Sequence, residues 1–266
     1  MILSSSNQQI KDIRRLKERK YRDETNLFFI EGIRLVFDAM RKPNNIKTLV
    51  YSRDLSKSEN SQEIVKTAIE IGVPVLEVGA DAFKALSGKD GPQGLAAVVK
   101  QEWEILQPAS ELRGPWTVLI EVADPGNLGT ILRTSDATGG AGIILVGHCT
   151  DPFDPAAARA SMGSIFSQRI VKAEKPVFIG WASANKQRLI GTSDRAELDY
   201  KDAIYSPESI LLMGSERQGI PLDIVTTCNV MVAIPMDGIS DSLNLAVATS
   251  VMMYERFNQQ RKGKTK

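Results

Sequence analysis

The chain has 266 residues, of which 42% are hydrophobic and 24% are charged, and its formal net charge is +1. This length suits one large domain or two modest ones, and the composition is that of a soluble globular protein. No stretch of 18 uncharged apolar residues occurs, and the N-terminus lacks the pattern of a secretory signal. We therefore expect a cytoplasmic protein without a membrane segment.

The cysteine and histidine content narrows the chemistry further. Cys149 and Cys228 are too few for a disulfide framework, and they fit a reducing compartment. The only histidine, His148, rules out a His-rich metal site, so no metal is expected. A Ser-His-Asp triad would have to use His148, which follows the apolar run IILVG and is better explained as the end of a strand.

Basic residues are concentrated at both ends of the chain. Residues 11–22 hold seven bases and two acids, and residues 256–266 hold five bases and no acid, which leaves a net charge of −9 for the remainder. Such segments attract polyanions, because Lys and Arg release counterions on meeting phosphates. A solvated helix and a solubilising tail would have the same composition, so the charge pattern alone leaves both interpretations open.

The first part of the chain predicts a small α/β domain at residues 1–104. Ile10, Ile13 and Leu16 have helical spacing, and apolar runs alternate with amphipathic segments after them. The predicted helices are 9–20, 32–41, 61–72 and 81–86, and the predicted strands are 28–31, 46–52, 74–78 and 93–100. A segment with two prolines and little periodicity follows, and it predicts a linker at 105–114.

The second part predicts another α/β domain, at residues 115–266. Its four predicted strands are continuous apolar runs at 116–122, 142–147, 209–214 and 230–235. Strands that are apolar on both faces indicate a parallel sheet covered by helices on both sides. Ligands of such sheets bind beyond the carboxyl ends of the strands, so the loops at those ends are the candidate site.

The first of these loops begins with the sequence VADPGNLGTILRT. Pro125 and Gly126 predict a turn, and Asn127 is placed as the N-cap of a helix. Arg133 lies off the apolar stripe of this helix, and helical side chains lean toward the N-terminus, so Arg133 should reach back toward Asn127. A simple cap and a surface arginine would give the same pattern.

Two further loops carry polar side chains next to buried strands. In LLMGSERQGIP, Gly214 allows a ligand to approach the backbone, and Glu216 follows at the sheet edge. In IPMDGISDSLNLAVATSVMMYE, a helix starting near Ser242 would bury Leu243, Ala246, Val247, Met253 and Tyr254. A cap does not account for Asn244, which is a poor helix former, so a ligand-binding helix start is predicted here. Neither a P-loop nor a dinucleotide fingerprint is present.

Together these motifs resemble the three ordered motifs of the SpoU family of RNA 2′-O-ribose methyltransferases, in the SPOUT superfamily. The resemblance rests on NLGTILRT, LLMGSERQGI and IPMDGISDSLNLAVA, with DPAAARASMGSIF between the first two. The segments KDIRRLKERKYRDETNLFFIEGIRLV and PQGLAAVV resemble the accessory RNA-binding domain of that family. The similarity covers nearly the whole chain. SERQGI departs from the more usual Asn-Glu-x-x-Gly form, and NLAVA departs from the commoner Asn-Val-Ser.

The resemblance implies a C-terminal methyltransferase domain with a trefoil knot, preceded by a ribosomal-protein-like RNA-binding domain. It also implies S-adenosylmethionine as the cofactor and a homodimer with its sites near the interface. By position, Gly214, Ile234 and Leu243 match cofactor contacts. The polar set around the ribose and the methyl group is matched by Asn127, Arg133, Glu216, Ser242 and Asn244.

The implied reaction is attack of a ribose 2′ oxygen on the sulfonium methyl carbon, with Arg133 at the reacting oxygen. Arg133 either accepts the proton or polarises the alkoxide while an RNA phosphate accepts it. Asn127 would orient Arg133 or the ribose, and Glu216 would hold Arg133. Ser242 and Asn244 would fix the loop and its substrate contacts.

For substrate binding, Arg14, Arg15 and Arg19 are the candidate phosphate contacts. Ribosomal RNA is the expected substrate, and transfer RNA is the alternative. A non-catalytic RNA-binding protein of the same fold is a rival interpretation, although Arg133, Glu216 and Asn244 are all present. A Rossmann-type methyltransferase, with DPGNLG as its glycine-rich loop, would leave the polar cluster after Ile234 without a role.

Overall fold

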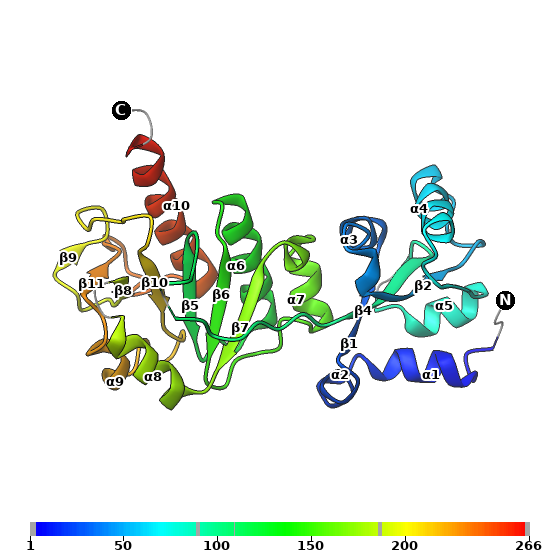
Figure 1. Cartoon of the computed structure of the whole chain (residues 1–266), viewed down its shortest axis with the longest axis horizontal. Helices are drawn as coiled ribbons and strands as arrows, with labels where there is room; N and C mark the ends of the chain where they lie inside the picture. The colour runs from blue at the N-terminus through cyan, green and yellow to red at the C-terminus, as the bar shows by residue number, and fades with distance from the viewer. Residues whose placement is uncertain (1–3, 89–90, 109, 186–187, 264–266) are drawn as a thin grey trace. The chain divides into compact units, whose positions relative to one another are not determined.

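The computed structural model of the chain contains two compact units, each built around its own β-sheet (Figure 1). The residues that it describes are 4–88, 91–108, 110–185 and 188–263. Unit 1 consists of Met1–Gln101 and Asp151–Phe166, and unit 2 consists of Glu102–Thr150 and Ser167–Lys266. The chain therefore passes from one unit to the other three times.

This division differs from the contiguous domains predicted at 1–104 and 115–266. Asp151–Phe166 packs with unit 1, although it lies inside the predicted C-terminal domain. The predicted linker, 105–114, belongs to unit 2, where Leu112 is buried in the core. Sequence pattern could not show either point, because both depend on contacts between segments that are distant along the chain.

Unit 1 contains a four-stranded sheet in the order β1-β4-β2-β3. Strand β4 is antiparallel to β1 and β2, and β2 is parallel to β3. The strands are β1 (Leu27–Glu31), β2 (Ile46–Tyr51), β3 (Val75–Glu77) and β4 (Leu95–Lys100). The helices before residue 101 are α1 (Gln8–Arg15), α2 (Arg19–Thr25), α3 (Ile33–Ala39), the 3-10 turn η1 (Pro43–Asn45), α4 (Glu59–Glu70) and α5 (Ala80–Leu86). All four predicted strands of this region are confirmed.

The predicted helix at 9–20 is wrong in one respect, because the chain breaks after Arg15 and starts α2 at Arg19. Arg22 explains the break. Its Nη1 donates to the carbonyl oxygens of Leu16 and Lys17, at 2.9 Å each. These carbonyls therefore bond to a side chain instead of continuing the helical ladder.

The segment Asp151–Phe166 is fixed to unit 1 by a buried ion pair and by aromatic contacts. The Nε of Arg22 lies 2.7 Å from a carboxylate oxygen of Asp151, and both side chains are at most 5% exposed. The ring of Phe28 lies 4.9 Å from that of Phe153 and 6.2 Å from that of Phe166. The segment contains α7 (Pro155–Ala160) and the 3-10 turn η2 (Ser164–Phe166).

Unit 2 contains a seven-stranded sheet in the order β7-β6-β5-β10-β8-β11-β9, and every neighbouring pair is parallel. The strands are β5 (Trp116–Ile120), β6 (Gly142–Val146), β7 (Arg169–Ala173), β8 (Leu189–Thr192), β9 (Leu198–Asp199), β10 (Ile210–Met213) and β11 (Val230–Ala233). The parallel sheet and its four predicted strands are confirmed. The short strands β7, β8 and β9 were not predicted.

Helices cover both faces of this sheet, as the apolar strands predicted (Figure 1). The helices of unit 2 are α6 (Pro125–Ala137), α8 (Lys175–Ala184), α9 (Leu222–Val225) and α10 (Leu245–Gly263). Phe178 of α8 and Ile224 of α9 share one core cluster with Trp116 and Val118 of β5. Helix α10 packs against α6 and β10. Among the described helices, none is long and apolar enough to cross a lipid bilayer. The trefoil knot stays a prediction.

Candidate active site

The loop after β5 enters α6 through Asp124, not through Asn127. The Asp124 carboxylate accepts a hydrogen bond from the backbone N–H of Asn127 at 2.6 Å, and Pro125 is the first helical residue. The predicted Asn127 cap and the Pro125–Gly126 turn are therefore wrong. An Asp before a Pro is the usual start of a helix, so the sequence did carry this signal. As a result, the Asn127 side chain is not needed for capping.

Asn127 instead joins three loops at the carboxyl edge of the sheet. Its Nδ2 donates to a carboxylate oxygen of Glu216, in the loop after β10, at 2.5 Å. Its Oδ1 accepts from Nδ2 of Asn244, in the segment after β11, at 3.1 Å. The carboxyl ends of parallel strands meet at one edge of a sheet, so these loops can converge although they are far apart in sequence.

The direction of this network follows from its two ends. At one end, Oδ1 of Asn244 accepts from the backbone N–H groups of Ala246 and Val247, at 2.9 and 3.3 Å. At the other end, the Glu216 carboxylate is an acceptor when ionised. Turning either amide around would place two donors or two acceptors face to face. The orientations of Asn127 and Asn244 are therefore determined by the groups that flank them.

Asn244 is the N-cap of α10, which corrects the prediction that this helix starts near Ser242. The carbonyl oxygen of Asn244 accepts from the N–H of Ala248 at 2.9 Å, as an N-cap carbonyl does. Asn244 was predicted not to be a cap, and this is wrong. Its side-chain oxygen caps α10, while its side-chain nitrogen donates to Asn127. Ala246 and Met253 are buried as predicted.

Two residues of α10 that were predicted to be interior lie on the surface. Val247 is 50% exposed and Tyr254 is 47% exposed. They are seven positions apart, so they lie on the same face of the helix. The core-facing positions include Thr249 and Met252 instead. The sequence misled here because polar Thr249 is buried while apolar Val247 is exposed, so polarity along this run does not mark the buried face.

Gly214 is needed for the packing of its own loop. A Cβ atom at Gly214 would overlap the backbone of Gly219 and Ile220. The loop closes on itself through a bridge between Ser215 and Gly219, in which the Gly219 N–H donates to the Ser215 carbonyl at 3.0 Å. The chain therefore makes a close approach of its own at Gly214, which constrains the loop that carries Glu216. Contact between Gly214 and a ligand stays a prediction.

The remaining predicted polar residues do not join the network. The Arg133 side chain is exposed and makes no hydrogen bond or ion pair with any residue that the structure describes, so the expected pairing with Glu216 is not formed there. It lies six positions after Asn127, which is about 9 Å along the helix axis. The Ser242 hydroxyl donates to the Asp241 carboxylate at 3.3 Å.

Two of the predicted cofactor contacts flank the loop after β11, and two exposed apolar residues of that loop were not predicted as ligand contacts. Ile234 and Leu243, at the two ends of the loop after β11, are half-buried. Between them, Met236 is 36% exposed and Ile239 is fully exposed. Apolar residues within a polar loop were the available signal for these two positions. The side chains at this edge can thus offer hydrogen bonds, one fixed carboxylate and apolar contacts to a ligand.

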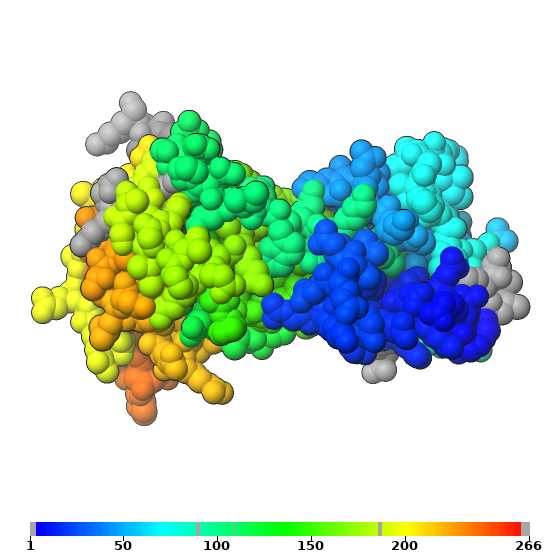
Figure 2. All heavy atoms as spheres, turned by 60° about the horizontal axis from the view of Figure 1, so that its bottom comes forward, coloured from blue at the N-terminus to red at the C-terminus, as the bar shows by residue number. Residues whose placement is uncertain are grey.

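The three arginines proposed to bind RNA differ in their surroundings. Arg15 lies 3.5 Å from the Asp12 carboxylate and over the ring of Tyr21. Arg19 lies 3.6 Å from the Asp23 carboxylate. The Arg14 side chain makes no ion pair or hydrogen bond with the part of the chain that the structure describes. Figure 2 shows α1 and α2, in blue, as a continuous exposed surface on this face of unit 1.

The residues considered for other chemistry have ordinary environments. His148 is exposed in the turn after β6. Cys149 and Cys228 are buried and form no disulfide bond with each other, and burial raises the pKa of the Cys149 thiol. Among the described residues, no cluster of three or more His, Cys, Asp or Glu side chains could hold a metal ion.

The architecture and the site define a two-unit α/β protein whose polar loops gather at one edge of a parallel sheet. Residues 116–254 match the SpoU rRNA Methylase family, and residues 7–97 match the MRM3-like substrate binding domain. The chain therefore belongs to the SpoU rRNA Methylase family.

Individual relatives cover nearly the whole chain. It is 31% identical to the 23S rRNA (guanosine(2553)-2'-O)-methyltransferase RlmP of Bacillus subtilis (strain 168), over 95% of this chain and 97% of the relative. It is 30% identical to the 23S rRNA (uridine(2479)-2'-O)-methyltransferase of Streptomyces viridochromogenes, over 94% of this chain and 89% of the relative. The crystal structure of AdoMet-bound rRNA methyltransferase from Sinorhizobium meliloti matches with a TM-score of 0.85, 37% identity and 97% coverage of both chains.

Proposed function

We propose that this chain transfers a methyl group from S-adenosylmethionine to the ribose 2′-hydroxyl of a nucleotide in ribosomal RNA. The observation that carries the proposal is the convergence of three loops through Asn127, Glu216 and Asn244 at the carboxyl edge of the sheet. The relatives from Bacillus subtilis and Streptomyces viridochromogenes are named 23S rRNA 2'-O-methyltransferases, which supports the reaction and the substrate class.

The residues at this edge suit S-adenosylmethionine, which is positively charged at its sulfonium and ammonium groups. Glu216, Asp237 and Asp241 are exposed acidic side chains on the two loops. Met236 and Ile239 offer apolar contacts of the kind that an adenine ring accepts. We infer that Gly214, Ile234 and Leu243 contact the cofactor. The AdoMet-bound relative from Sinorhizobium meliloti supports the choice of cofactor.

In the reaction, the cofactor supplies an electrophilic methyl group on sulfur. The protein has to hold a ribose 2′ oxygen in line with that methyl group, and such alignment lowers a barrier by several kcal/mol. Asn127 and Asn244 form a rigid edge against which the ribose is held, because both amides are fixed at each end. Glu216 fixes Asn127 in turn. Ser242 completes the loop beside the substrate.

Arg133 acts on the oxygen that loses its proton. A guanidinium does not give up its own proton at neutral pH, so Arg133 stabilises the developing alkoxide by donating hydrogen bonds. An RNA phosphate then receives the hydroxyl proton. The exposed position of Arg133, without a partner among the described residues, leaves its donors available to RNA.

We assign the binding of the RNA substrate to unit 1. Arg14, Arg15 and Arg19 lie on the exposed α1–α2 surface and contact RNA phosphates. The match of residues 7–97 to a substrate binding domain supports this role. Recognition of a particular site then depends on the bases of an unpaired segment, since RNA is read mostly where its bases are unstacked.

The working form is a homodimer. Val247 and Tyr254 form an exposed apolar face on α10, the helix whose N-cap belongs to the site. An apolar face of this kind is buried by a second copy of the chain in a symmetric interface. Sedimentation equilibrium of the full chain tests this, and a monomer at micromolar concentration would contradict it. A cytoplasmic location stays a prediction.

The function is tested by transfer of tritium from labelled S-adenosylmethionine to RNA from a strain that lacks this gene. We expect label in ribosomal RNA and none in the transfer RNA fraction. Mapping of 2′-O-methyl positions should then show one nucleotide that is unmodified in the deletion strain and modified after incubation with the protein. Label in transfer RNA alone would show that transfer RNA, and not ribosomal RNA, is the substrate. Binding of RNA without any methyl transfer would favour a non-catalytic RNA-binding protein.

A further inference from the structure

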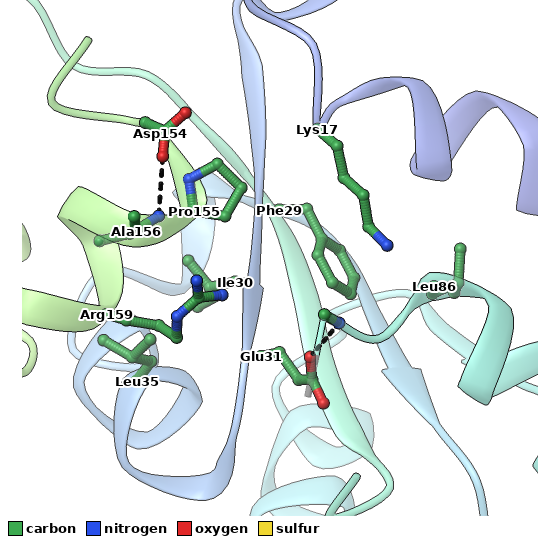
Figure 3. Close-up of a pocket in the computed structure, with 12 residues that line it drawn as sticks. Lys17, Phe29, Ile30, Glu31, Leu35, Leu86, Asp154, Pro155, Ala156 and Arg159 are labelled. Carbon is green, nitrogen blue, oxygen red and sulfur yellow. Dashed lines mark hydrogen bonds between the residues drawn. The ribbon is translucent and has the colours of Figure 1, made fainter. Parts of the chain in front are cut away.

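Unit 1 contains a cavity of about 280 Å³ at the place where β1, the end of α5 and α7 meet (Figure 3). Phe29 and Leu86 give it an apolar wall, and its charged lining residues are Lys17, Arg159, Glu31 and Asp154. The Asp154 carboxylate already accepts from the Ala156 N–H at 2.8 Å and lies 3.5 Å from the Arg22 guanidinium. Sites for drug-sized ligands are typically about 300–1,000 Å³. The cavity is slightly smaller, and it is therefore suited to a ligand no larger than one nucleotide.

Two cations approach this cavity over the turn at Ser87 and Gly88. The Lys17 amino group donates to the Ser87 carbonyl at 3.0 Å. A guanidinium nitrogen of Arg159 lies 3.6 Å from the position that a Cβ of Gly88 would occupy. The Arg159 side chain forms no hydrogen bond or ion pair with a residue that the structure describes. Burial lowers the pKa of Lys17, and the charges of Arg14 and Arg159 add to this effect.

Glu31 holds the turn beneath the two cations. Its carboxylate accepts from the Ser87 hydroxyl at 2.7 Å and from the Gly88 N–H at 3.1 Å, and the residue is only 5% exposed. Glu31 also offsets part of the positive charge at Lys17. The wall of the cavity is therefore fixed, while the Arg159 guanidinium is exposed for a ligand.

Building on the proposed function, we propose that this cavity receives one nucleotide of single-stranded RNA. The base lies against Phe29 and Leu86, and its phosphate binds Lys17 and Arg159. Two like charges placed together cost free energy unless an anion joins them. An apolar wall next to them takes the face of an unstacked base, which is how proteins commonly bind single-stranded RNA.

Part of this site lies on a segment that is continuous in sequence with strands of unit 2. Arg159 lies within the region that matches the SpoU rRNA Methylase family, yet its segment packs in unit 1. That segment runs from the end of β6 to the start of β7 in the catalytic sheet. A nucleotide in the cavity thus contacts a segment whose two ends enter the sheet that carries the reaction.

Two independent changes test the site in the full-length protein. The first is the double variant Lys17→Met with Arg159→Met, which removes both charges and keeps an unbranched apolar stem at each position. The second is Gly88→Leu, which fills the entrance without removing a charge. Apart from the chain neighbours of Gly88, the atom of the described residues that a Cβ at Gly88 meets within 4 Å is that guanidinium nitrogen, in ordinary contact, so the backbone should tolerate the change. Gly88→Ala and Lys66→Met are the matched controls, and Lys66 lies on α4, away from the cavity-lining residues.

The probe is ribosomal RNA from a strain lacking this gene, and the readouts are filter binding and methyl transfer at several salt concentrations. We expect both test variants to raise the Kd and the KM for RNA about tenfold, with kcat and the Kd for S-adenosylmethionine unchanged. Removing one phosphate contact to a single strand should lower the slope of log K against log salt by about 0.7 in the charge variant. Gly88→Leu should lower the slope by a similar amount, because a nucleotide that is kept out of the cavity also loses its phosphate contact. Both controls should match the original chain.

Test variants that bind RNA as the controls do would overturn the inference. A mixture of the four nucleoside monophosphates separates RNA from a free nucleotide. Binding of a monophosphate that Gly88→Leu abolishes, with the KM for RNA unchanged, would assign the cavity to a free nucleotide and would also overturn it. Because filter binding needs no catalysis, a protein that transfers no methyl group would refute the proposed function and leave this test valid.

Discussion

Asn127 and Glu216 are 89 positions apart in the chain, and their side chains are joined by a hydrogen bond of 2.5 Å. The bond links the first turn of α6 to the loop after β10, and a second bond continues it to the start of α10. The network therefore holds together loops that are far apart in the sequence, and the proposed reaction depends on their relative positions.

The first prediction concerns the charge balance of this bond. In Asn127→Asp a second carboxylate would face Glu216, so methyl transfer should fall at least tenfold, which corresponds to losing a charged hydrogen bond of about 1.5–3 kcal/mol. Adding Glu216→Gln should restore much of the activity, because its amide can donate to Asp at position 127. Initial rates of tritium transfer measure the activity of the single and the double variant. A double variant no better than Asn127→Asp would show that the pair does not act through this bond.

Asn244 has two functions that separate variants can distinguish. Asn244→Asp keeps an oxygen to cap α10 but removes the donor to Asn127, so activity should fall while stability changes little. Asn244→Ala loses the cap as well, and the free energy of unfolding should drop by about 1 kcal/mol. Urea unfolding and methyl-transfer assays compare the two. Equal stability of both variants would contradict the capping role.

Arg133 is predicted to act in the reaction and not in cofactor binding. Arg133→Ala should abolish methyl transfer while the Kd for S-adenosylmethionine, measured by calorimetry, stays within twofold. The Arg133 side chain is exposed and makes no hydrogen bond or ion pair with a residue that the structure describes. The change in unfolding free energy should therefore be below about 0.5 kcal/mol. Arg133→Lys serves as a control, since it keeps the charge but not the planar donor geometry. A comparable loss of cofactor binding would refute the assignment.

Gly214 is predicted to tolerate no side chain. Gly214→Ala would force a Cβ into the backbone of Gly219 and Ile220, so it should cost about 1–3 kcal/mol and weaken cofactor binding. Gly238→Ala is the matched control on the loop after β11, because the nearest atom to its Cβ lies at 4.0 Å. Thermal unfolding and calorimetry compare the two. Similar effects at both positions would argue against crowding as the cause.

The buried pair of Arg22 and Asp151 is predicted to hold the segment Asp151–Phe166 in unit 1. Arg22→Met would leave the Asp151 carboxylate buried without its charged partner, which typically costs about 3–5 kcal/mol. Lys20→Met removes a cation from an exposed pair on the same helix, so its cost should be about 0–1 kcal/mol. Equal midpoints in urea would contradict this prediction.

The local pattern of apolar and polar residues was sufficient to predict those features of the fold that repeat along the chain. The apolar runs predicted four strands of the catalytic sheet and their parallel arrangement, since only strands covered on both faces are apolar throughout. The polar loops at the ends of those strands predicted where Asn127, Glu216 and Asn244 would lie. The helix starts were missed by two or three residues, because Asp124 and Asn244 compete with their neighbours as caps.

By itself the sequence determined the class of fold, the edge of the sheet that carries the site and the family to which the chain belongs. Only the tertiary structure decided that Asn127 bonds to Glu216 and Asn244 and that Arg133 does not. It also assigned Asp151–Phe166 to unit 1. The physical reason is that apolar periodicity is fixed by burial over a few residues. The choice of partner for a polar side chain depends on which distant groups the folded chain brings within hydrogen-bonding distance.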